Sequence, residues 1–334
     1  MTALSADFSY RWCRSGKAFN RCPVPAVQEF LRKRKLEALR EHTRNLEIVI
    51  TDSGAALRRR GSSADCYPLR QSFFDKLMRW YQFPLQALHR MELDEVLPLM
   101  NAVLRLIAKP VVIYIEDGEA LTIVSTRFLH VPDAMLLSVR QSDSPLLVTR
   151  TDHFMHLFGE EISKVEVQPG DIVGIGSSVV NSETGFNALS VGWYLMRLVC
   201  SNGAVVPISL FHNKIYHSNE SSVRIHVDKA LDQLNEASGK SGDVIRLLRR
   251  SLKAENPPRA FAEQGLNPLI GYWNAKELLD AQYDDRSAKL FDLFNRVTYS
   301  AKRQPPRIRL AMEELAGSWL WHGEEIPSTR QASG

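Results

Sequence analysis

The chain has 334 residues, of which 44% are hydrophobic and 24% charged, a composition typical of a soluble globular protein. No apolar run approaches the length that crosses a bilayer, and the four cysteines have no disulfide-framework spacing, which excludes a membrane-spanning or disulfide-stapled class. The net charge is +4, but residues 1–70 contain fourteen Lys and Arg against seven Asp and Glu.

This uneven charge indicates a basic arm beside a nearly neutral body, a pattern common in proteins that meet a polyanion. The alternative is a solvated, partly disordered tail. The start of the chain lacks the basic residues and apolar core of a secretory signal, so we expect a cytoplasmic protein.

The first part of the chain predicts a basic, partly flexible extension followed by helices. One helix is expected near residues 24–43, and a mobile basic loop over residues 54–65. Apolar residues recur at i, i+3, i+4 and i+7 in residues 71–81, which predicts a helix with one buried face. The same period continues from Leu93 to Ile107.

Strand patterns follow. Residues 111–116 and 121–127 flank Asp117-Gly118, which suits a tight hairpin turn, and further strands are expected at 172–180, 188–200 and 205–215. From residue 223 onward the periodicity is helical again, and Trp80, Trp193, Trp273 and Trp319 fall within apolar patterns typical of a core. The predicted class is therefore α+β, a mostly antiparallel sheet flanked by N-terminal helices and a helical C-terminal third. The predicted domains are residues 1–65, 66–217 and 218–334.

Three segments carry a family signature when they are taken together. They are the helical stretch from Leu69-Arg-Gln-Ser-Phe-Phe to Asn101, the segment 121–135, and 179–185 leading into Arg197-Leu-Val-Cys-Ser-Asn-Gly203. In this the chain resembles the phage- and plasmid-type proteins of domain of unknown function nine-three-two. The resemblance covers roughly residues 66–320 and implies a prophage, plasmid or integrative-element context. It offers no catalytic residue to carry over, so Arg197, Cys200, Asn202 and Gly203 are motif residues of unknown role.

Several residue patterns resemble parts of cofactor, metal or catalytic sites. Gly174-Ile-Gly176 lies inside a predicted strand and not at a strand-to-helix turn, so strand packing is favoured over a dinucleotide site. His153 and His156 offer half of a metal site at most, and Cys200 has no base shown beside it, so a core thiol is favoured over a nucleophile. We therefore predict no metal and no cofactor, and favour a protein without enzymatic activity over the alternative of an enzyme that uses Cys200 or the His153/His156 pair.

A basic stripe gives a sharper geometric prediction. Arg246, Arg249, Arg250 and Lys253 fall at i, i+3, i+4 and i+7, so a helix aligns them on one face, opposite Val244 and Leu248. Such a stripe can follow a phosphate backbone, and a solvated helix face is the alternative. With Trp12 as a stacking aromatic, the predicted nucleic-acid-binding residues are Trp12, Arg32, Lys33, Arg34, Lys35, Arg58, Arg59, Arg60, Arg246, Arg249, Arg250 and Lys253.

The sequence therefore favours a nucleic-acid-binding protein of a mobile element, acting on single-stranded DNA in annealing or recombination. A homo-oligomer is compatible with this function. The alternative is a protein–protein module in phage–host conflict or regulation, whose basic arm meets an acidic protein partner. No membrane partner is expected.

Overall fold

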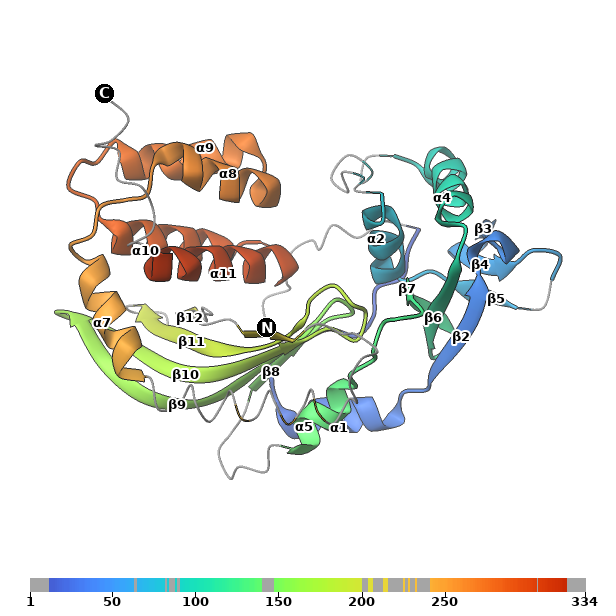
Figure 1. Ribbon diagram of the computed structural model, residues 1–334, viewed down its shortest axis with the longest axis horizontal. Helices are drawn as coiled ribbons and strands as arrows, with labels where there is room; N and C mark the ends of the chain where they lie inside the picture. Colours follow the sequence, from blue (N-terminus) through green and yellow to red (C-terminus); the bar gives the residue numbers. More distant parts are fainter. Residues whose placement is uncertain are drawn as a thin grey trace. The chain divides into compact units, whose positions relative to one another are not determined.

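The structure is a computed structural model that describes residues 12–62, 65–81, 83, 88, 91–139, 147–199, 204–206, 213–215, 225, 228, 232, 241–304 and 306–322. The chain forms two compact units (Figure 1). Unit 1 comprises residues 1–156, 180–189 and 215–227, and unit 2 comprises residues 157–179, 190–214 and 228–334. Helices and antiparallel sheets occur together, with a helical C-terminal region, which confirms the predicted α+β class.

Unit 1 contains two small antiparallel sheets with helices packed on them. The strand orders are β2-β6-β7 and β3-β4-β5, while β1 pairs with β8. Its elements are β1 (Phe19–Pro23), α1 (Val24–Lys33), β2 (Leu36–His42), η1 (Thr43–Asn45), β3 (Leu46–Thr51), β4 (Gly54–Arg59), β5 (Cys66–Pro68), α2 (Gln71–Arg79), α4 (Leu93–Ile107), β6 (Pro110–Glu116), β7 (Glu119–Ser125), α5 (Asp133–Val139) and β8 (Leu147–Arg150).

Within the predicted flexible extension over residues 1–65, the described residues from Phe19 to Arg59 form strands and helices of unit 1, which corrects that prediction for this part of the range. The expected helix over 24–43 ends at Lys33, because Arg34 takes an extended conformation at its C-cap. The chain then pairs along β6 from Leu36 to His42. The first half of the expected mobile loop is β4, which pairs with β3 and includes buried Ala55 to Leu57.

The local predictions that follow are confirmed. The helix expected over 71–81 is α2, and the one from Leu93 to Ile107 is α4. β6 and β7 form the expected hairpin, in which Asp117 has φ 52° and Gly118 has φ 81°. Positive φ at both central positions is what a two-residue turn of this twist requires. The core of unit 1 packs α2 and α4 against both sheets, with Phe73 and Phe74 at its centre.

Unit 2 is layered. Figure 1 shows the strands β9 to β11 covered by the pair α10–α11, with the pair α8–α9 beyond it. β9, β10, β11 and β12 are neighbours in that order, and β13 pairs with β11. The elements are β9 (Met155–Gln168), β10 (Asp171–Asn181), β11 (Leu189–Val199), β12 (Ala204–Val206), β13 (Asn213–Ile215), α7 (Ser241–Ser251), α8 (Arg259–Ile270), α9 (Tyr272–Tyr283), α10 (Leu290–Ala301) and α11 (Pro306–His322). The first residues of β9 and the last of β10 belong to unit 1.

The core of unit 2 joins the sheet to the C-terminal helices. Val173 and Ile175 of β10 belong to the same buried cluster as Phe291 and Trp319. Gly176 lies inside β10, as expected from the sequence. A Cβ at this position would clash with the ring of Tyr194. Among the residues that the structure describes, every helix is too short or too polar to span a bilayer.

Candidate functional site

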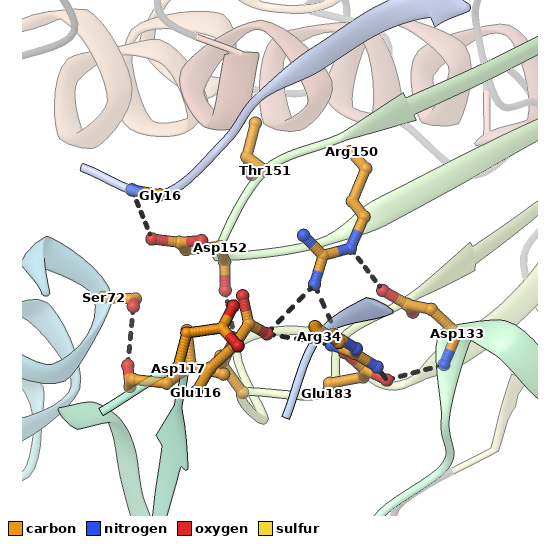
Figure 2. A network of polar contacts seen from close by, with 12 residues as sticks. Gly16, Arg34, Ser72, Glu116, Asp117, Asp133, Arg150, Thr151, Asp152 and Glu183 are labelled. Carbon is orange, nitrogen blue, oxygen red and sulfur yellow. Dashed lines mark hydrogen bonds and ion pairs between the residues drawn. The ribbon is translucent and has the colours of Figure 1, made fainter. Parts of the chain in front are cut away.

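Unit 1 holds a buried set of ionised side chains that sequence reasoning did not single out. We call it the charge network: Arg34, Arg70, Arg150, Glu116, Glu119, Asp133, Asp152 and Glu183. Figure 2 shows several of these side chains pointing toward one another. Glu119, at 18%, is the most exposed member, and Glu116 is fully buried.

Glu183 is the main acceptor on one side of the charge network. It follows β10, and Arg34, which follows α1, donates to both of its oxygens at 2.5 and 2.6 Å. The backbone N–H of Asp133 donates to Glu183 Oε1 at 2.7 Å, and Arg150 Nη2 donates to Oε2 at 3.4 Å. Burial opposes ionisation of this carboxyl, but the hydrogen bonds and charge of Arg34 outweigh it and lower the pKa of Glu183 to about 2.

Glu116, at the end of β6, joins two arginines. Arg70 Nη1 donates to its Oε1 at 2.8 Å and Arg34 Nη1 to its Oε2 at 3.0 Å. Arg70 also donates to Glu119 at 2.8 Å and to Asp152 at 3.2 Å. Since Arg70 directly precedes α2 and Asp152 lies two residues after β8, the network joins segments that lie far apart in the sequence.

Asp133, the first residue of α5, is the least easily ionised carboxyl of the group. Arg150 Nε donates to its Oδ2 at 3.0 Å, and Asn181 Nδ2 donates to its Oδ1 at 2.8 Å. Complete burial, followed by the negative charge of Glu183, nevertheless raises the pKa of Asp133 to about 7. Three arginines face five carboxyl groups here, so uptake of a proton at one carboxyl reduces an excess of negative charge.

The chemistry of this network is structural. Paired carboxyls with divergent pKa values also occur in catalytic sites, but there they face a cleft. The side chains of Glu116, Arg150 and Glu183 are at most 3% exposed. Such groups hold a fold together, and we assign them no catalytic role.

The other candidates for chemistry are also engaged in structural contacts. His153 is hydrogen-bonded to Asp75 at 2.8 Å and its ring lies 4.6 Å from that of Phe186. His156 is buried. Burial, and then the charge of Asp75, raises the pKa of the Cys13 thiol, which disfavours the nucleophilic thiolate. Within the described ranges, no three His, Cys, Asp or Glu side chains are grouped as metal ligands.

Two of the nucleic-acid-binding residues predicted near the N-terminus have buried side chains. Arg34 and Trp12 are wrong as nucleic-acid contacts, because both are buried. The Arg34 side chain is 6% exposed and doubly paired in the charge network. The Trp12 ring packs edge-on against Phe74 at 4.8 Å, so it anchors the N-terminal segment to the core.

The remaining N-terminal cations are exposed or half-buried, but most are matched by carboxylates. Arg32 and Lys33 both pair with Glu29, at 2.9 and 2.8 Å. Arg58 pairs with Glu47 at 2.8 Å and Arg59 with Glu41 at 3.0 Å. Arg60 donates to the Leu46 carbonyl, and the backbone N–H of Lys35 donates to Asp117. Four of these six cations therefore share three carboxylates, which reduces the positive charge of this region without cancelling it.

The predicted stripe on α7 is a different case. Arg246, Arg249, Arg250 and Lys253 are all exposed, while Val244, Leu248 and Ser251 on the opposite side are buried. Arg246 pairs with Asp243. Neither Arg249 nor Lys253 has an ion pair within the part of the chain that the structure describes. The α7 cation face, by which we mean these four residues, therefore carries net positive charge.

The contacts described above do not include the residues of the family motif. Cys200, Asn202 and Gly203 lie outside the described residues, and Arg197 is placed only as a residue of β11 that pairs with Val206. Comparison with protein-family models, with curated proteins and with solved structures gives no match to this chain. The phage- and plasmid-type assignment stays a prediction from sequence.

Proposed function

We propose that this protein binds nucleic acid through the α7 cation face of unit 2. The observation that supports the proposal is that Arg249 and Arg250 are exposed at the end of α7 and Lys253 is exposed two residues beyond it, while the other side of the helix is buried. Side chains spaced in this way can each meet a phosphate, and every contact releases a condensed counterion.

We limit the proposed nucleic-acid interface to unit 2. The N-terminal basic residues contribute to the fold of unit 1 or pair with neighbouring carboxylates, so we place the contact with nucleic acid in unit 2. The mobile-element setting and a role in annealing or recombination rest on the family resemblance alone and are part of the proposal.

Binding of a fluorescent oligonucleotide by the full chain tests the proposal. The double variant Arg249→Gln/Lys253→Gln removes two positive charges from the α7 cation face, and we expect it to weaken binding for all sequences alike. The matched control, Arg32→Gln/Lys33→Gln, removes two positive charges from the last turn of α1, where each is paired with Glu29.

We expect the control to bind as the unchanged protein does. Equal losses in the two double variants would show that only overall charge matters, and would remove α7 from the interface. Failure of the unchanged protein to bind any oligonucleotide at low ionic strength would reject nucleic-acid binding.

One observation favours the second candidate, a protein–protein module. Trp273, expected in the core from its apolar neighbours, is 77% exposed, which corrects that expectation. Tyr272 beside it is 52% exposed, and the two rings meet edge-to-face at 5.1 Å. Exposed Trp and Tyr are the residue types that most often dominate protein interfaces. A partner captured by the full chain after nuclease treatment, and lost with Trp273→Ala, would support this function.

A further inference from the structure

A second face of unit 2 combines an exposed aromatic ring with positive charge. Tyr299, near the end of α10, is 55% exposed. Lys302 Nζ lies 5.4 Å and Arg303 Cζ 5.6 Å from the centroid of its ring. The two cations directly follow the end of α10 at Ala301, and these distances place both beside the ring.

This side of α10 has no part in the core. Arg296, at i−3, is also exposed, whereas Phe294, Val297 and Ala301 on the opposite side are buried. Arg296 Nε donates to Gln282 Oε1 at 3.3 Å, and its charge helps to lower the pKa of Asp285, after the hydrogen bonds from Ser287. Asp292 accepts a hydrogen bond from the Lys289 backbone N–H at 2.8 Å and caps the helix N-terminus. The ring of Tyr299 therefore lies among cations, without being needed for packing.

The position of Tyr299 relative to α7 follows from backbone contacts within unit 2. The N–H of Leu290, the first residue of α10, donates to the carbonyl of Ala254 at 3.0 Å, directly after Lys253. Tyr299 follows Leu290 by nine residues, which is about 13 Å of helix. A nucleic-acid strand advances about 3.4 Å per nucleotide along a duplex axis and farther when it is extended, so a few nucleotides cover that length. Figure 1 shows α7 beside the α10–α11 pair, which it contacts.

We infer that Tyr299 stacks on an unpaired base while Arg296, Lys302 and Arg303 contact the adjoining phosphates, so that the ligand of unit 2 is a single strand. The inference rests on the proposed nucleic-acid binding and names its substrate class. Ring stacking beside cations is the general mode of sequence-independent single-strand binding, since every base has a π face. In a duplex both faces of each base are covered by its neighbours, and the ring has nothing to stack on.

The test compares three ligands of equal length on the full chain: oligothymidylate, a deoxyribose-phosphate strand without bases, and a duplex. We expect Tyr299→Ala to weaken oligothymidylate binding by about 5- to 150-fold, the range typical of one stacked base. Its binding to the abasic strand should be unchanged, which also shows that the variant is folded. Tyr299→Phe keeps the ring and should bind oligothymidylate as the unchanged protein does. Trp273→Ala is the matched control and should have no effect, because the cation at i+3 from this exposed ring, Lys276, is paired with Asp280 at 2.6 Å.

These measurements distinguish a failure of base stacking from a failure of nucleic-acid binding itself. If the unchanged protein binds oligothymidylate but Tyr299→Ala binds it equally well, or if duplex and single strand bind with the same affinity, stacking is refuted while nucleic-acid binding stands. If the unchanged protein binds none of the three ligands, the proposed function itself is refuted.

Discussion

Replacing Glu183 by Gln tests whether the charge network stabilises unit 1 as the structure implies. The substitution keeps the volume of the side chain and removes its negative charge. Arg34 donates to both carboxylate oxygens, at 2.5 and 2.6 Å, and the Asp133 N–H donates to one of them. A glutamine offers a single acceptor oxygen, and its amide group then faces a donor. Arg34 and Arg150 are left buried with an incomplete set of partners.

Removing one partner of a buried ion pair typically costs about 3–5 kcal/mol of unfolding free energy. For a body of this size each kcal/mol corresponds to roughly 2–4 °C in Tm. We therefore expect the transition of unit 1 in differential scanning calorimetry to fall by roughly 6–20 °C.

The matched control is Glu29→Gln. Glu29 also pairs with two cations, Arg32 and Lys33, but on the surface of α1. Exposed ion pairs contribute little, so this variant should unfold close to the temperature of the unchanged protein. If Glu183→Gln behaved like Glu29→Gln, the buried charges would not be stabilising unit 1, and the account of the charge network would be wrong.

Three further outcomes are expected. In urea titrations, the free energy of unfolding should fall as pH rises from about 4 to about 7, because the pKa of Asp133 is raised to about 7 in the folded state. For one proton the fall is about 1.4 kcal/mol per pH unit. Between about pH 2 and pH 4.5 the free energy of unfolding should instead rise with pH, because the pKa of Glu183 is lowered to about 2. Asp133→Asn should remove the falling limb, and its persistence in that variant would assign the proton elsewhere. Gly176→Ala should destabilise unit 2, since the new Cβ meets the Tyr194 ring. The control Gly242→Ala, at the start of α7 with open space around it, should be neutral or stabilising by up to about 1 kcal/mol. Equal Tm values for the two variants would contradict the close packing at Gly176. Arg58→Gln should leave oligonucleotide affinity unchanged, because Glu47 already compensates this charge, and a loss of binding would return β4 to the interface.

The parts of the fold that sequence predicted are those set by neighbouring residues. The apolar period of α2 and α4, and Asp117-Gly118 between β6 and β7, are local signals. The stripe on α7 is local too, because helical spacing alone decides which residues share a face. Its exposure and the burial of Val244 and Leu248 agree with that pattern.

The predictions that failed depended on partners distant in the sequence. Arg34 belongs to a run of four cations, yet it is buried because Glu183, 149 residues away, lies beside it. Arg70 is likewise buried beside a distant partner, Glu116, which is 46 residues away in the sequence. A charge at the end of an apolar strand, such as Glu116 or Arg150, was the available sign of a buried pair. It does not say which residue is the partner.

Trp273 shows the opposite failure. Its apolar neighbours suggested burial, but the helix α9 begins at Tyr272 and turns Ala275 and Leu279 toward the core. The tryptophan lies on another side of that helix and is left in solvent. A periodic pattern gives the buried face only once the phase of the helix is known.

The salt dependence of oligothymidylate binding tests the proposed role of the α7 cation face most directly. Each phosphate contact with a single strand contributes about 0.7 to the slope of log K against log salt, so Arg249→Gln/Lys253→Gln should reduce the slope by about 1.4. The control Arg32→Gln/Lys33→Gln should leave it unchanged. Binding whose slope is the same in all three proteins would contradict the proposal that nucleic acid lies along α7.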